Sequence, residues 1–293
     1  MKKLFLEGCG TALLTPFKGT EVDYDCYASL VDRQVEAGID ILVPLGTTAE
    51  TPCLSVEEKL RLLSITKQHA AGRPIIVGGG TNSLVGTVKN MRELEPYSPD
   101  AYLIVAPYYN KPTQEGLYEY FKAVAETTDK GIVLYNVPGR TGVNISAETT
   151  LRLAEEVENI IAIKEASSRY AQISEILRHR PEGFSVLSGN DNETLSLMAT
   201  GAQGVISVAS NIAPALMVEL TRLMKAGDLV KARELHHRLS PLFRDCFIES
   251  NPIPAKAAMA QLGLMENSLR LPLVPATQRT EDAMRITLKE LFD

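Results

Sequence analysis

A single lysine ends an apolar, strand-like run near the middle of the chain. The run reads Ile160-Ile161-Ala162-Ile163-Lys164, and Glu165-Ala166-Ser167-Ser168 follows it. A lysine held away from water gives up its proton more readily, and the neutral amine can attack a carbonyl to form a Schiff base. Lysines at strand ends also commonly extend into solvent, so the chemical interpretation of Lys164 depends on the residues around it.

A loop rich in hydroxyl groups follows another apolar run, at Leu45-Gly46-Thr47-Thr48-Ala49-Glu50-Thr51. Thr47, Thr48 and the backbone amides can hold a small carboxylate with little bulk, and Gly46 allows a tight turn. The same hydroxyls could instead cap the following helix. By itself this motif indicates an anion site only weakly.

Two further loops combine phenols with turn residues. One reads Ala106-Pro107-Tyr108-Tyr109-Asn110-Lys111-Pro112, and its tyrosines could relay protons or anchor an interface. The other reads Leu134-Tyr135-Asn136-Val137-Pro138-Gly139-Arg140-Thr141-Gly142. Here Tyr135 could shuttle a proton and Arg140 could hold a carboxylate through two parallel hydrogen bonds. The alternative makes Tyr135 a core residue and Arg140 a surface cation, but so many turn residues favour the functional interpretation.

Glycines mark the ends of two more apolar runs. These ends read Leu187-Ser188-Gly189-Asn190-Asp191 and Gly204-Val205-Ile206-Ser207-Val208-Ala209-Ser210. Gly189 and Gly204 permit close approach of the backbone to a ligand. Ordinary turns between strand and helix would look the same, so neither segment identifies a function alone.

The chemical residues lie at the ends of regularly spaced elements. Short apolar runs alternate with stretches of helical period, at residues 10–15, 41–45, 74–78, 101–106, 131–136, 160–164, 184–188 and 204–208. Eight such units predict an α/β fold, the (β/α)8 TIM barrel, whose active site lies at the carboxyl ends of the strands. Helix starts are expected after Ser55, with Glu58 completing a capping box, and at Thr113 and Ser146.

The remainder of the chain reads as purely helical. Helices are expected at residues 213–225, 228–248, 254–262 and 280–292. We therefore expect a barrel catalytic domain over 1–225 and a C-terminal helical extension over 226–293, which would cover the barrel or pair with another subunit.

Composition excludes several classes of protein. The net charge of −6 and a pI near 5.4 argue against a nucleic-acid partner. The cysteines are scattered and the four histidines form no ligand motif, so neither a disulfide framework nor a metal is predicted. No apolar run is long enough to span a membrane, and the start Met1-Lys2-Lys3-Leu4 lacks the pattern of a secretory signal. A cytoplasmic location is expected.

Together these motifs resemble the dihydrodipicolinate synthase family, within the pyruvate-dependent class I aldolase superfamily of (β/α)8 lyases. The resemblance covers nearly the whole chain. It depends on five segments in family order and spacing: Gly46-Thr47-Thr48-Ala49-Glu50, Pro107-Tyr108-Tyr109-Asn110, Tyr135 to Gly142, Ile163-Lys164-Glu165-Ala166 and Gly204-Val205-Ile206-Ser207.

The resemblance implies catalytic roles for four residues. Lys164 is expected to form the Schiff base with pyruvate, and Tyr135 to assist as acid and base. Thr47 and Tyr109 would complete a proton relay. In the family the second tyrosine of the pair reaches into the neighbouring subunit's site, so Tyr109 is expected to serve another subunit.

The resemblance also implies the substrates and their binding residues. Thr48 would bind the pyruvate carboxylate, and Gly189 and the backbone carbonyl of Ile206 would approach the bound pyruvate. Arg140 would bind the carboxylate of aspartate 4-semialdehyde. The expected product is (4S)-4-hydroxy-2,3,4,5-tetrahydrodipicolinate, an intermediate of lysine and diaminopimelate synthesis. Neither metal nor organic cofactor is expected, because the protonated imine is itself the electron sink.

Assembly and alternatives follow from the same resemblance. A homotetramer built from two tight dimers is expected. The nearest alternative is an N-acetylneuraminate lyase or a keto-deoxy sugar acid aldolase, which would share Lys164 and Tyr135 but not call for Arg140. A catalytically silent, ligand-binding member is a further alternative, although every catalytic residue type is present.

Two departures from the family pattern affect regulation. Ala49 replaces the second glycine of the commoner loop and leaves the hydroxyls in place. Lysine-inhibited members carry histidine, or histidine and glutamate, after this loop, whereas residues 51–59 contain no histidine and Gly86 stands where the glutamate is expected. Weak or absent inhibition by lysine is therefore predicted, with Tyr108 and Asn82 as remnants of such a site.

Overall fold

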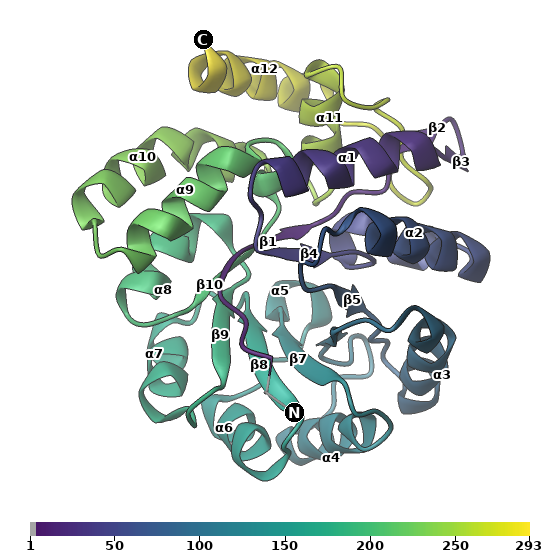
Figure 1. Ribbon diagram of the computed structural model, residues 1–293, viewed down its shortest axis with the longest axis vertical. Coiled ribbons are helices and arrows are strands. Elements are labelled where there is room, and N and C mark those ends of the chain that lie inside the picture. The colour runs from purple at the N-terminus through teal and green to yellow at the C-terminus, as the bar shows by residue number, and fades with distance from the viewer. Residues whose placement is uncertain (1–3) are drawn as a thin grey trace. The chain divides into compact units, whose positions relative to one another are not determined.

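A computed structural model describes residues 4–293 (Figure 1). Met1-Lys2-Lys3, which contributed to the expectation about a secretory signal, lies outside the described residues. The chain separates into two compact units. Unit 1 contains the described residues up to Glu7 together with Ile75–Ile206, and unit 2 contains Gly8–Pro74 and Ser207–Asp293.

Unit 1 is built on parallel strands. In the part of the chain that the structure describes, these are β5 (Ile76–Gly78), β6 (Ala101–Val105), β7 (Gly131–Asn136), β8 (Ile160–Glu165), β9 (Ser185–Ser188) and β10 (Gly204–Ser207), whose last residue is the first of unit 2's second segment. Their order is β10-β9-β8-β7-β6-β5. Every residue of β8 and β9 is buried, as expected for parallel strands covered on both faces.

Helices follow the strands of unit 1 in the alternation that the sequence predicts (Figure 1). Their bounds are α3 (Leu84–Leu94), η3 (Glu95–Tyr97), α4 (Gln114–Ala125), α5 (Pro138–Thr141), α6 (Ala147–Glu156), α7 (Tyr170–His179), η4 (Asp191–Glu193) and α8 (Thr194–Ala199). The expected caps are present, since the Thr113 hydroxyl accepts from Gly116 N and the Ser146 hydroxyl from Thr149 N.

Unit 2 joins the beginning of the chain to its end. The N-terminal segment contains β1 (Gly8–Ala12), β2 (Phe17–Lys18), β3 (Glu21–Val22), α1 (Tyr24–Glu36), β4 (Ile41–Val43), η1 (Thr47–Ala49), η2 (Thr51–Cys53) and α2 (Val56–His69). Strands β1 and β4 pair in parallel, and β2 and β3 form a small hairpin that the sequence did not predict. The predicted capping box at α2 is confirmed, with Glu58 N donating to Ser55 Oγ and Ser55 N to the Glu58 carboxylate.

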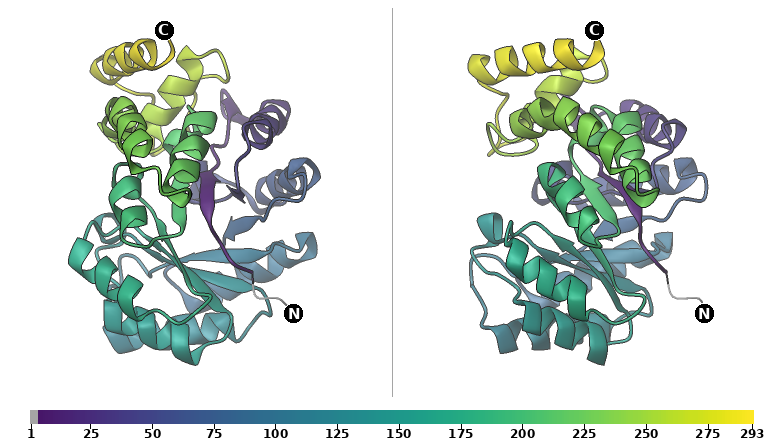
Figure 2. Two further views of the ribbon diagram at one scale, coloured as in Figure 1. Left: turned by 60° about the vertical axis from the view of Figure 1, so that its left-hand side comes forward. Right: turned by 90° about the vertical axis from the view of Figure 1, so that its left-hand side faces the viewer.

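The C-terminal segment of unit 2 is helical, as predicted. It contains η5 (Ala209–Asn211), α9 (Pro214–Lys225), α10 (Leu229–Asp245), α11 (Ile253–Gln261) and α12 (Gln278–Phe292). Helix α12, the yellow C-terminal helix, packs against α10 and α11 (Figure 2). A buried contact joins two of these helices, because the Thr287 hydroxyl of α12 donates to Asp245 Oδ2 of α10.

The two units together supply the elements of a (β/α)8 barrel with a C-terminal helical extension, so the predicted fold class is confirmed. Among residues 4–293, eight parallel strands belong to one sheet. Each predicted strand overlaps a strand of the structure, and its ends differ by about three residues at most. The division at residue 225 stays a prediction, since the compact units follow other bounds. In the described residues, no helix has both the length and the apolarity needed to cross a membrane.

Candidate active site

Lys164 and Tyr135 are brought together on neighbouring strands of unit 1. They are register partners across β7 and β8. The Lys164 Nζ lies 4.4 Å from the centroid of the Tyr135 ring, and the two residues are only 5% and 7% exposed. The amine thus lies over the face of the phenol ring in a buried setting, and amines and phenols are groups that serve as nucleophile and as acid or base in attack on a carbonyl. The structure therefore joins the two residues that the sequence singled out for proton transfer and nucleophilic attack.

Gly189 gives the Lys164 side chain its room. A Cβ built on Gly189 would lie 3.2 Å from Lys164 Cε and 2.7 Å from the Ala166 Cβ. The Gly189 amide donates to Glu165 O at 2.7 Å, which fixes the glycine beside the end of β8. A side chain here would displace the lysine. Ile206, on β10, is fully buried, and its neighbour Val205 is in register with Ser188 of β9.

A buried polar cluster lies one residue beyond the lysine and the tyrosine. Asn136 and Glu165 form the next register pair of β7 and β8, and neither is exposed. Glu165 Oε1 accepts from Asn136 Nδ2 at 3.0 Å and Ser167 N at 2.9 Å, and Oε2 accepts from Gln172 Nε2 at 3.3 Å. Burial raises the pKa of Glu165, and hydrogen bonds from Ser167, Asn136 and Gln172 oppose that rise. Residues Asn136, Asn144, Glu165 and Gln172 are called the Glu165 cluster below.

Arg140 lies on a short loop that begins and ends at residues of the Glu165 cluster. The single turn α5 carries it and ends at Gly142, whose φ of +72° is in the left-handed region. The Thr141 hydroxyl donates to Val143 O at 2.9 Å and ties the turn internally. The Arg140 side chain is exposed, so its guanidinium is accessible to an anion. The role of Arg140 in binding a carboxylate stays a prediction, and no sequence pattern indicated what holds its loop.

The two tyrosines of the loop that follows β6 are more exposed to solvent than Tyr135. Tyr109 is 89% exposed and Tyr108 is 39% exposed. Tyr109 has a φ of +73° and Lys111 a φ of +43°, both rare for residues with side chains. Asn110 Nδ2 donates to Asn82 O at 2.8 Å and fixes the loop. Within the single chain, Tyr109 therefore points to solvent and is not buried with Lys164.

The hydroxyl loop of unit 2 is a pair of tight turns. Leu45 and Glu50 bracket it with φ values of +57° and +53°. The Thr51 hydroxyl donates to Gly46 O at 2.8 Å across the turn. Thr48 is 3% exposed, and its Oγ accepts from Asn251 Nδ2 at 3.0 Å. Because that bond occupies a lone pair, the Thr48 proton is available to donate to another acceptor.

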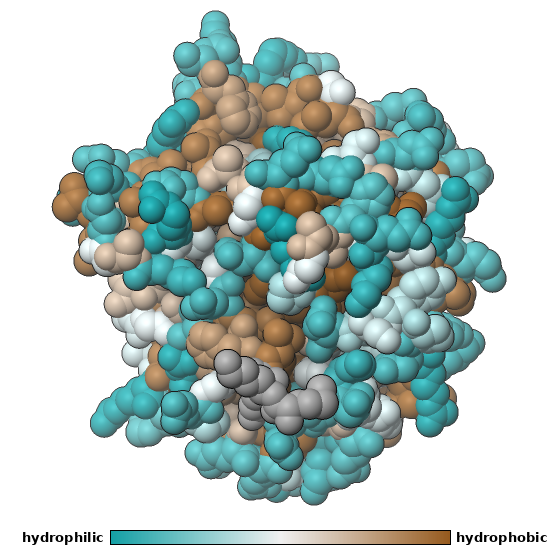
Figure 3. All heavy atoms as spheres, in the orientation of Figure 1, coloured by the Kyte–Doolittle hydropathy of each residue, from teal (hydrophilic) through white to brown (hydrophobic). Residues whose placement is uncertain are grey.

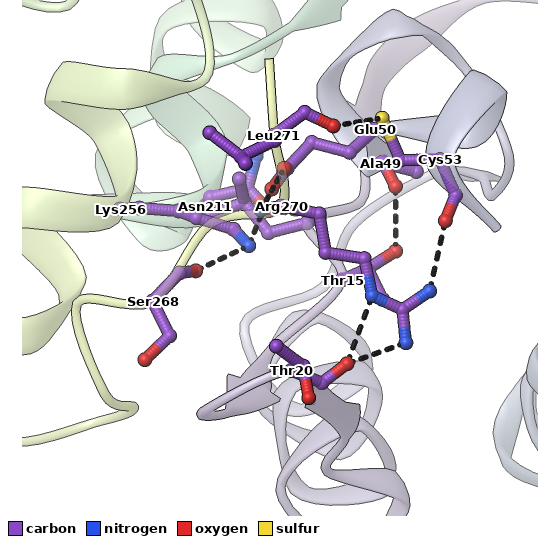
Figure 4. A network of polar contacts seen from close by, with 11 residues as sticks. Thr15, Thr20, Ala49, Glu50, Cys53, Asn211, Lys256, Ser268, Arg270 and Leu271 are labelled. Carbon is purple, nitrogen blue, oxygen red and sulfur yellow. Dashed lines mark hydrogen bonds and ion pairs between the residues drawn. The ribbon is translucent and has the colours of Figure 1, made fainter. Parts of the chain in front are cut away.

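A buried ion pair supports this loop from the C-terminal helices (Figure 4). Lys256 of α11 is fully buried, and its Nζ lies 2.5 Å from Glu50 Oε1 and donates to Ser268 O at 2.9 Å. The ammonium also lies 4.0 Å from the centroid of the Phe17 ring. Burial lowers the pKa of Lys256 to about 8, although the attraction of Glu50 opposes the change. Glu50 in turn occupies its left-handed position at the end of η1.

Arg270 extends the same network around the outside of the loop (Figure 4). Its backbone amide donates to Glu50 Oε2 at 3.0 Å. Its guanidinium makes two parallel hydrogen bonds to the Glu58 carboxylate, at 2.6 and 2.7 Å, and also donates to Thr20 O and Cys53 O. The hydrogen bond from Arg270 is the main cause that lowers the pKa of Glu58. The hydroxyl loop is thus held by residues of the C-terminal segment.

Sequence reasoning missed these supporting residues. One signal was available: Lys256 is a single cation within Ile253-Pro254-Ala255-Lys256-Ala257-Ala258-Met259, an apolar stretch that is buried throughout. The same pattern drew attention to Lys164. For Asn136 and Glu165 the signal was strand alternation, which places them on the face opposite Tyr135 and Lys164. In residues 4–293 no group of three or more potential metal ligands is found.

Comparison with known proteins points in one direction. A sequence model of the "Dihydrodipicolinate synthetase family" matches residues 5–291. A 4-hydroxy-tetrahydrodipicolinate synthase from Thermotoga sp. (strain RQ2) is 48% identical, with 97% of this chain and 98% of the relative aligned. A crystal structure of dihydrodipicolinate synthase from Thermotoga maritima is 47% identical, with a TM-score of 0.97 over 98% of this chain and 99% of the other. The dihydrodipicolinate synthase of Acinetobacter baumannii, solved in complex with pyruvate, is 38% identical, with a TM-score of 0.94 over 97% and 98%.

Proposed function

This chain belongs to the dihydrodipicolinate synthetase family, and on that premise we propose that it condenses pyruvate with aspartate 4-semialdehyde. The product is (4S)-4-hydroxy-2,3,4,5-tetrahydrodipicolinate, which serves lysine and diaminopimelate synthesis. The observation that carries the proposal is the buried contact between the Lys164 amine and the Tyr135 ring. The names of the relatives do not favour the alternative, a sugar acid aldolase.

Lys164 is the nucleophile in this proposal. Its amine attacks the keto carbon of pyruvate, and loss of water gives an imine. The protonated imine withdraws electrons, so the pyruvate methyl group loses a proton and becomes an enamine. That carbon attacks the aldehyde of the second substrate, and the substrate amine then displaces Lys164 as the ring closes. Tyr135, whose ring lies against the lysine, delivers and removes the protons through its hydroxyl.

The remaining residues bind the two substrates. Thr48 donates to the pyruvate carboxylate, and the hydrogen bond that its oxygen accepts from Asn251 supports that role. Thr47 assists the proton relay from the same turn. Gly189 and the carbonyl of Ile206 accommodate the bound pyruvate, and the exposed guanidinium of Arg140 binds the carboxylate of the semialdehyde. No metal or organic cofactor takes part.

Tyr109 completes the relay in a neighbouring subunit. Its ring is 89% exposed in one chain, and its backbone has a φ of +73°, a conformation that costs energy. Other large apolar side chains are also exposed, including Val85 and Leu271 at 79% each. Brown hydrophobic areas occur among hydrophilic ones near the C-terminal helices (Figure 3). We propose a homotetramer of two tight dimers, in which neighbouring subunits would cover such side chains, and a cytoplasmic location.

Lysine inhibits this enzyme weakly or not at all, according to the same proposal. Asn82 and Tyr108 are present, but residues 51–59 carry no histidine and Gly86 stands in place of a glutamate. A titration with lysine should leave activity flat to about millimolar concentrations, where a specific site would already be filled. Half-inhibition at tens of micromolar would contradict this part of the proposal.

The principal test measures turnover of pyruvate and aspartate 4-semialdehyde with a coupled reductase. We expect turnover by the wild type and its loss in Lys164→Ala and Arg140→Ala. Lys89→Ala, which removes an exposed lysine of α3, is the matched control and should retain activity. Borohydride reduction with pyruvate should label the wild type and Arg140→Ala at Lys164. A labelled wild type that does not turn over the semialdehyde would move the substrate to a sugar acid, and an unlabelled one would exclude the Schiff-base mechanism.

A further inference from the structure

Two consecutive register pairs of β7 and β8 have different surroundings and different roles. Tyr135 and Lys164 form one pair, and Asn136 and Glu165 form the next. Because side chains alternate along a strand, the second pair faces away from the first. The first pair carries the chemistry of the proposed function. The second pair, although fully buried and polar, has no place in that chemistry.

Asn136 closes the loop that carries Arg140. Its Oδ1 accepts from Ile145 N at 3.0 Å, and its Nδ2 donates to Asn144 Oδ1 at 3.0 Å and to Ile145 O at 3.3 Å. The loop leaves β7 immediately after Asn136 and returns at Asn144 and Ile145. The side chain of the residue at which the loop begins therefore binds the residues at which it ends.

Glu165 holds that amide from the other side. The Asn136 Nδ2 lies 3.0 Å from Glu165 Oε1 and 3.1 Å from Oε2. Gln172 of α7 bridges back to the loop, because its Nε2 donates to Glu165 Oε2 at 3.3 Å and its Oε1 accepts from Asn144 Nδ2 at 2.8 Å. The chain of contacts thus runs from the residue after Lys164 to both ends of the Arg140 loop.

The chemistry of the cluster favours a carboxylate. The groups that reach Glu165 from Asn136, Gln172 and the Ser167 backbone are N–H donors, and the Ser167 hydroxyl also forms a hydrogen bond to this carboxylate. An ionised carboxylate only accepts hydrogen bonds, whereas a glutamine of the same shape would place an NH2 group against these donors. Leaving buried donors unpaired is costly, so this position distinguishes a glutamate from a glutamine by charge and proton count, not by size.

We propose that Glu165, acting through Asn136, is a positioning residue that sets the Arg140 loop and so determines the affinity for the second, carboxylate-bearing substrate. This inference rests on the proposed function, and it assigns Glu165 no contact with either substrate. The two substrates should therefore respond differently to its loss. Pyruvate reacts on the strand face that carries Lys164, whereas the semialdehyde depends on the placement of Arg140.

Glu165→Gln is the decisive variant. We expect its rate of borohydride trapping with pyruvate to stay within about twofold of wild type, while KM for aspartate 4-semialdehyde rises about tenfold, because a small displacement of a binding group weakens affinity steeply. Hydrogen exchange should accelerate in residues 137–145, including the Ile145 amide that Asn136 holds. Asn136→Asp, which sets a second carboxylate against Glu165, should show the same pattern.

Asn159→Asp is the matched control at the opposite end of β8. Asn159 Nδ2 donates to three carbonyl groups, those of Ala125, Thr128 and Lys130, so a carboxylate there also disrupts a polar cluster of unit 1. We expect Asn159→Asp to lower the free energy of unfolding without changing the ratio of KM for pyruvate to KM for aspartate 4-semialdehyde. If Glu165→Gln raised both KM values equally, or left both KM values and the exchange of residues 137–145 unchanged, the positioning role would be overturned. A wild type inactive toward the semialdehyde would remove the proposed function, and the exchange measurement would still decide whether Glu165 orders this loop.

Discussion

At the scale of single residues, the reactive lysine depends on a neighbour that has no side chain. The methyl group of an alanine at 189 would lie 3.2 Å from Lys164 Cε and 2.7 Å from the Ala166 Cβ. Contacts this short force the lysine away from its position against the Tyr135 ring. We expect Gly189→Ala to slow borohydride trapping with pyruvate by about tenfold or more, since misplacement of a nucleophile is costly.

The control for this substitution is Gly116→Ala in α4. There the nearest atom to an added methyl group is Pro112 Cβ at 3.3 Å, and the residue is helical. Alanine in a helix is generally tolerated or stabilising. Trapping by Gly116→Ala should match the wild type. Equal trapping rates in Gly189→Ala and wild type would show that Lys164 does not need the space beside Gly189.

At the scale of elements, the ion pair of Glu50 and Lys256 joins the hydroxyl loop to α11. Both side chains are fully buried. Removing one partner of a buried pair leaves the other charge uncompensated, which costs about 3–5 kcal/mol. We expect Glu50→Gln and Lys256→Met each to lower the free energy of unfolding by about that amount, measured by urea denaturation. The double variant should be more stable than the sum of the two losses predicts, because no lone charge remains.

This expectation would be contradicted if the double variant lost as much free energy of unfolding as the two single variants together. Additivity would mean that each side chain is stabilised by separate contacts, such as the bond from Lys256 to Ser268 O or the bond from Arg270 N to Glu50. Met224→Leu in α9, a change of shape within a buried apolar position, serves as a control for the assay. It should cost less than about 1.5 kcal/mol.

A second ion pair makes stability depend on pH. The hydrogen bonds from Arg270 lower the pKa of Glu58 from its ordinary 4.5. A carboxylate whose pKa is lower in the folded chain stabilises it fully above the unfolded value, and the contribution is lost as pH falls through the folded value. We expect Glu58→Gln to cost about 1 kcal/mol at pH 7, since the pair is partly exposed, and less at pH 3, which lies below the ordinary pKa.

The measurement is urea unfolding of wild type and Glu58→Gln at both pH values. Glu155→Gln, which changes an exposed carboxylate of α6, controls for the general effect of removing a charge. The difference between wild type and Glu58→Gln should shrink on acidification, while that for Glu155→Gln stays small. A difference that stayed unchanged at pH 3 would mean that the charge of Glu58 is not what stabilises the chain.

The strands were predictable because each is a continuous apolar run buried on both faces. Strand β8 is the clearest case, since its six residues, Ile160–Glu165, are all buried and end in the residues that drew attention to the site. The small hairpin of β2 and β3 was missed, because each strand has two residues and is too short to show an alternation of apolar and polar side chains. The caps at Ser55, Thr113 and Ser146 were predictable, since they depend only on residues three positions away.

The support of the site was not predictable in the same way. The bond between Asn251 and Thr48 joins positions 203 apart in sequence, and no local pattern carries that information. The Glu165 cluster was missed for a different reason. Its two strand residues, Asn136 and Glu165, lie on the strand face opposite the reacting groups, although alternation alone places them there.

At the scale of the whole molecule, the exposure of Tyr109 leads to a prediction about active sites that two subunits share. If Tyr109 serves a neighbouring subunit, then Tyr109→Phe and Lys164→Ala should each be inactive but should restore each other when mixed and allowed to exchange subunits. Random mixing makes half of the dimers hybrid, each with one complete site, so about a quarter of wild-type turnover is expected. The measurement is the coupled assay before and after exchange.

A mixture of Tyr109→Phe with Arg140→Ala should behave in the same way, because Arg140 belongs to the subunit that supplies Lys164 in this proposal. A mixture of Lys164→Ala with Arg140→Ala is the control, since no hybrid dimer then contains a complete site. No turnover in the first mixture would mean that Tyr109 does not act across subunits, and turnover in the control would mean that Arg140 and Lys164 come from different subunits.

Unit 2 is made of two segments that flank unit 1 in the chain, and this arrangement sets an order of events on the ribosome. The residues that hold the hydroxyl loop, Asn251, Lys256 and Arg270, are among the last to be synthesised. Segments up to Ile206 already contain everything that unit 1 comprises. Since nascent domains fold as their segments emerge, the lysine and its tyrosine can assemble while Thr48 still awaits its partners. A polypeptide released early would thus contain Lys164 and Tyr135 but would lack the residues that hold the hydroxyl loop.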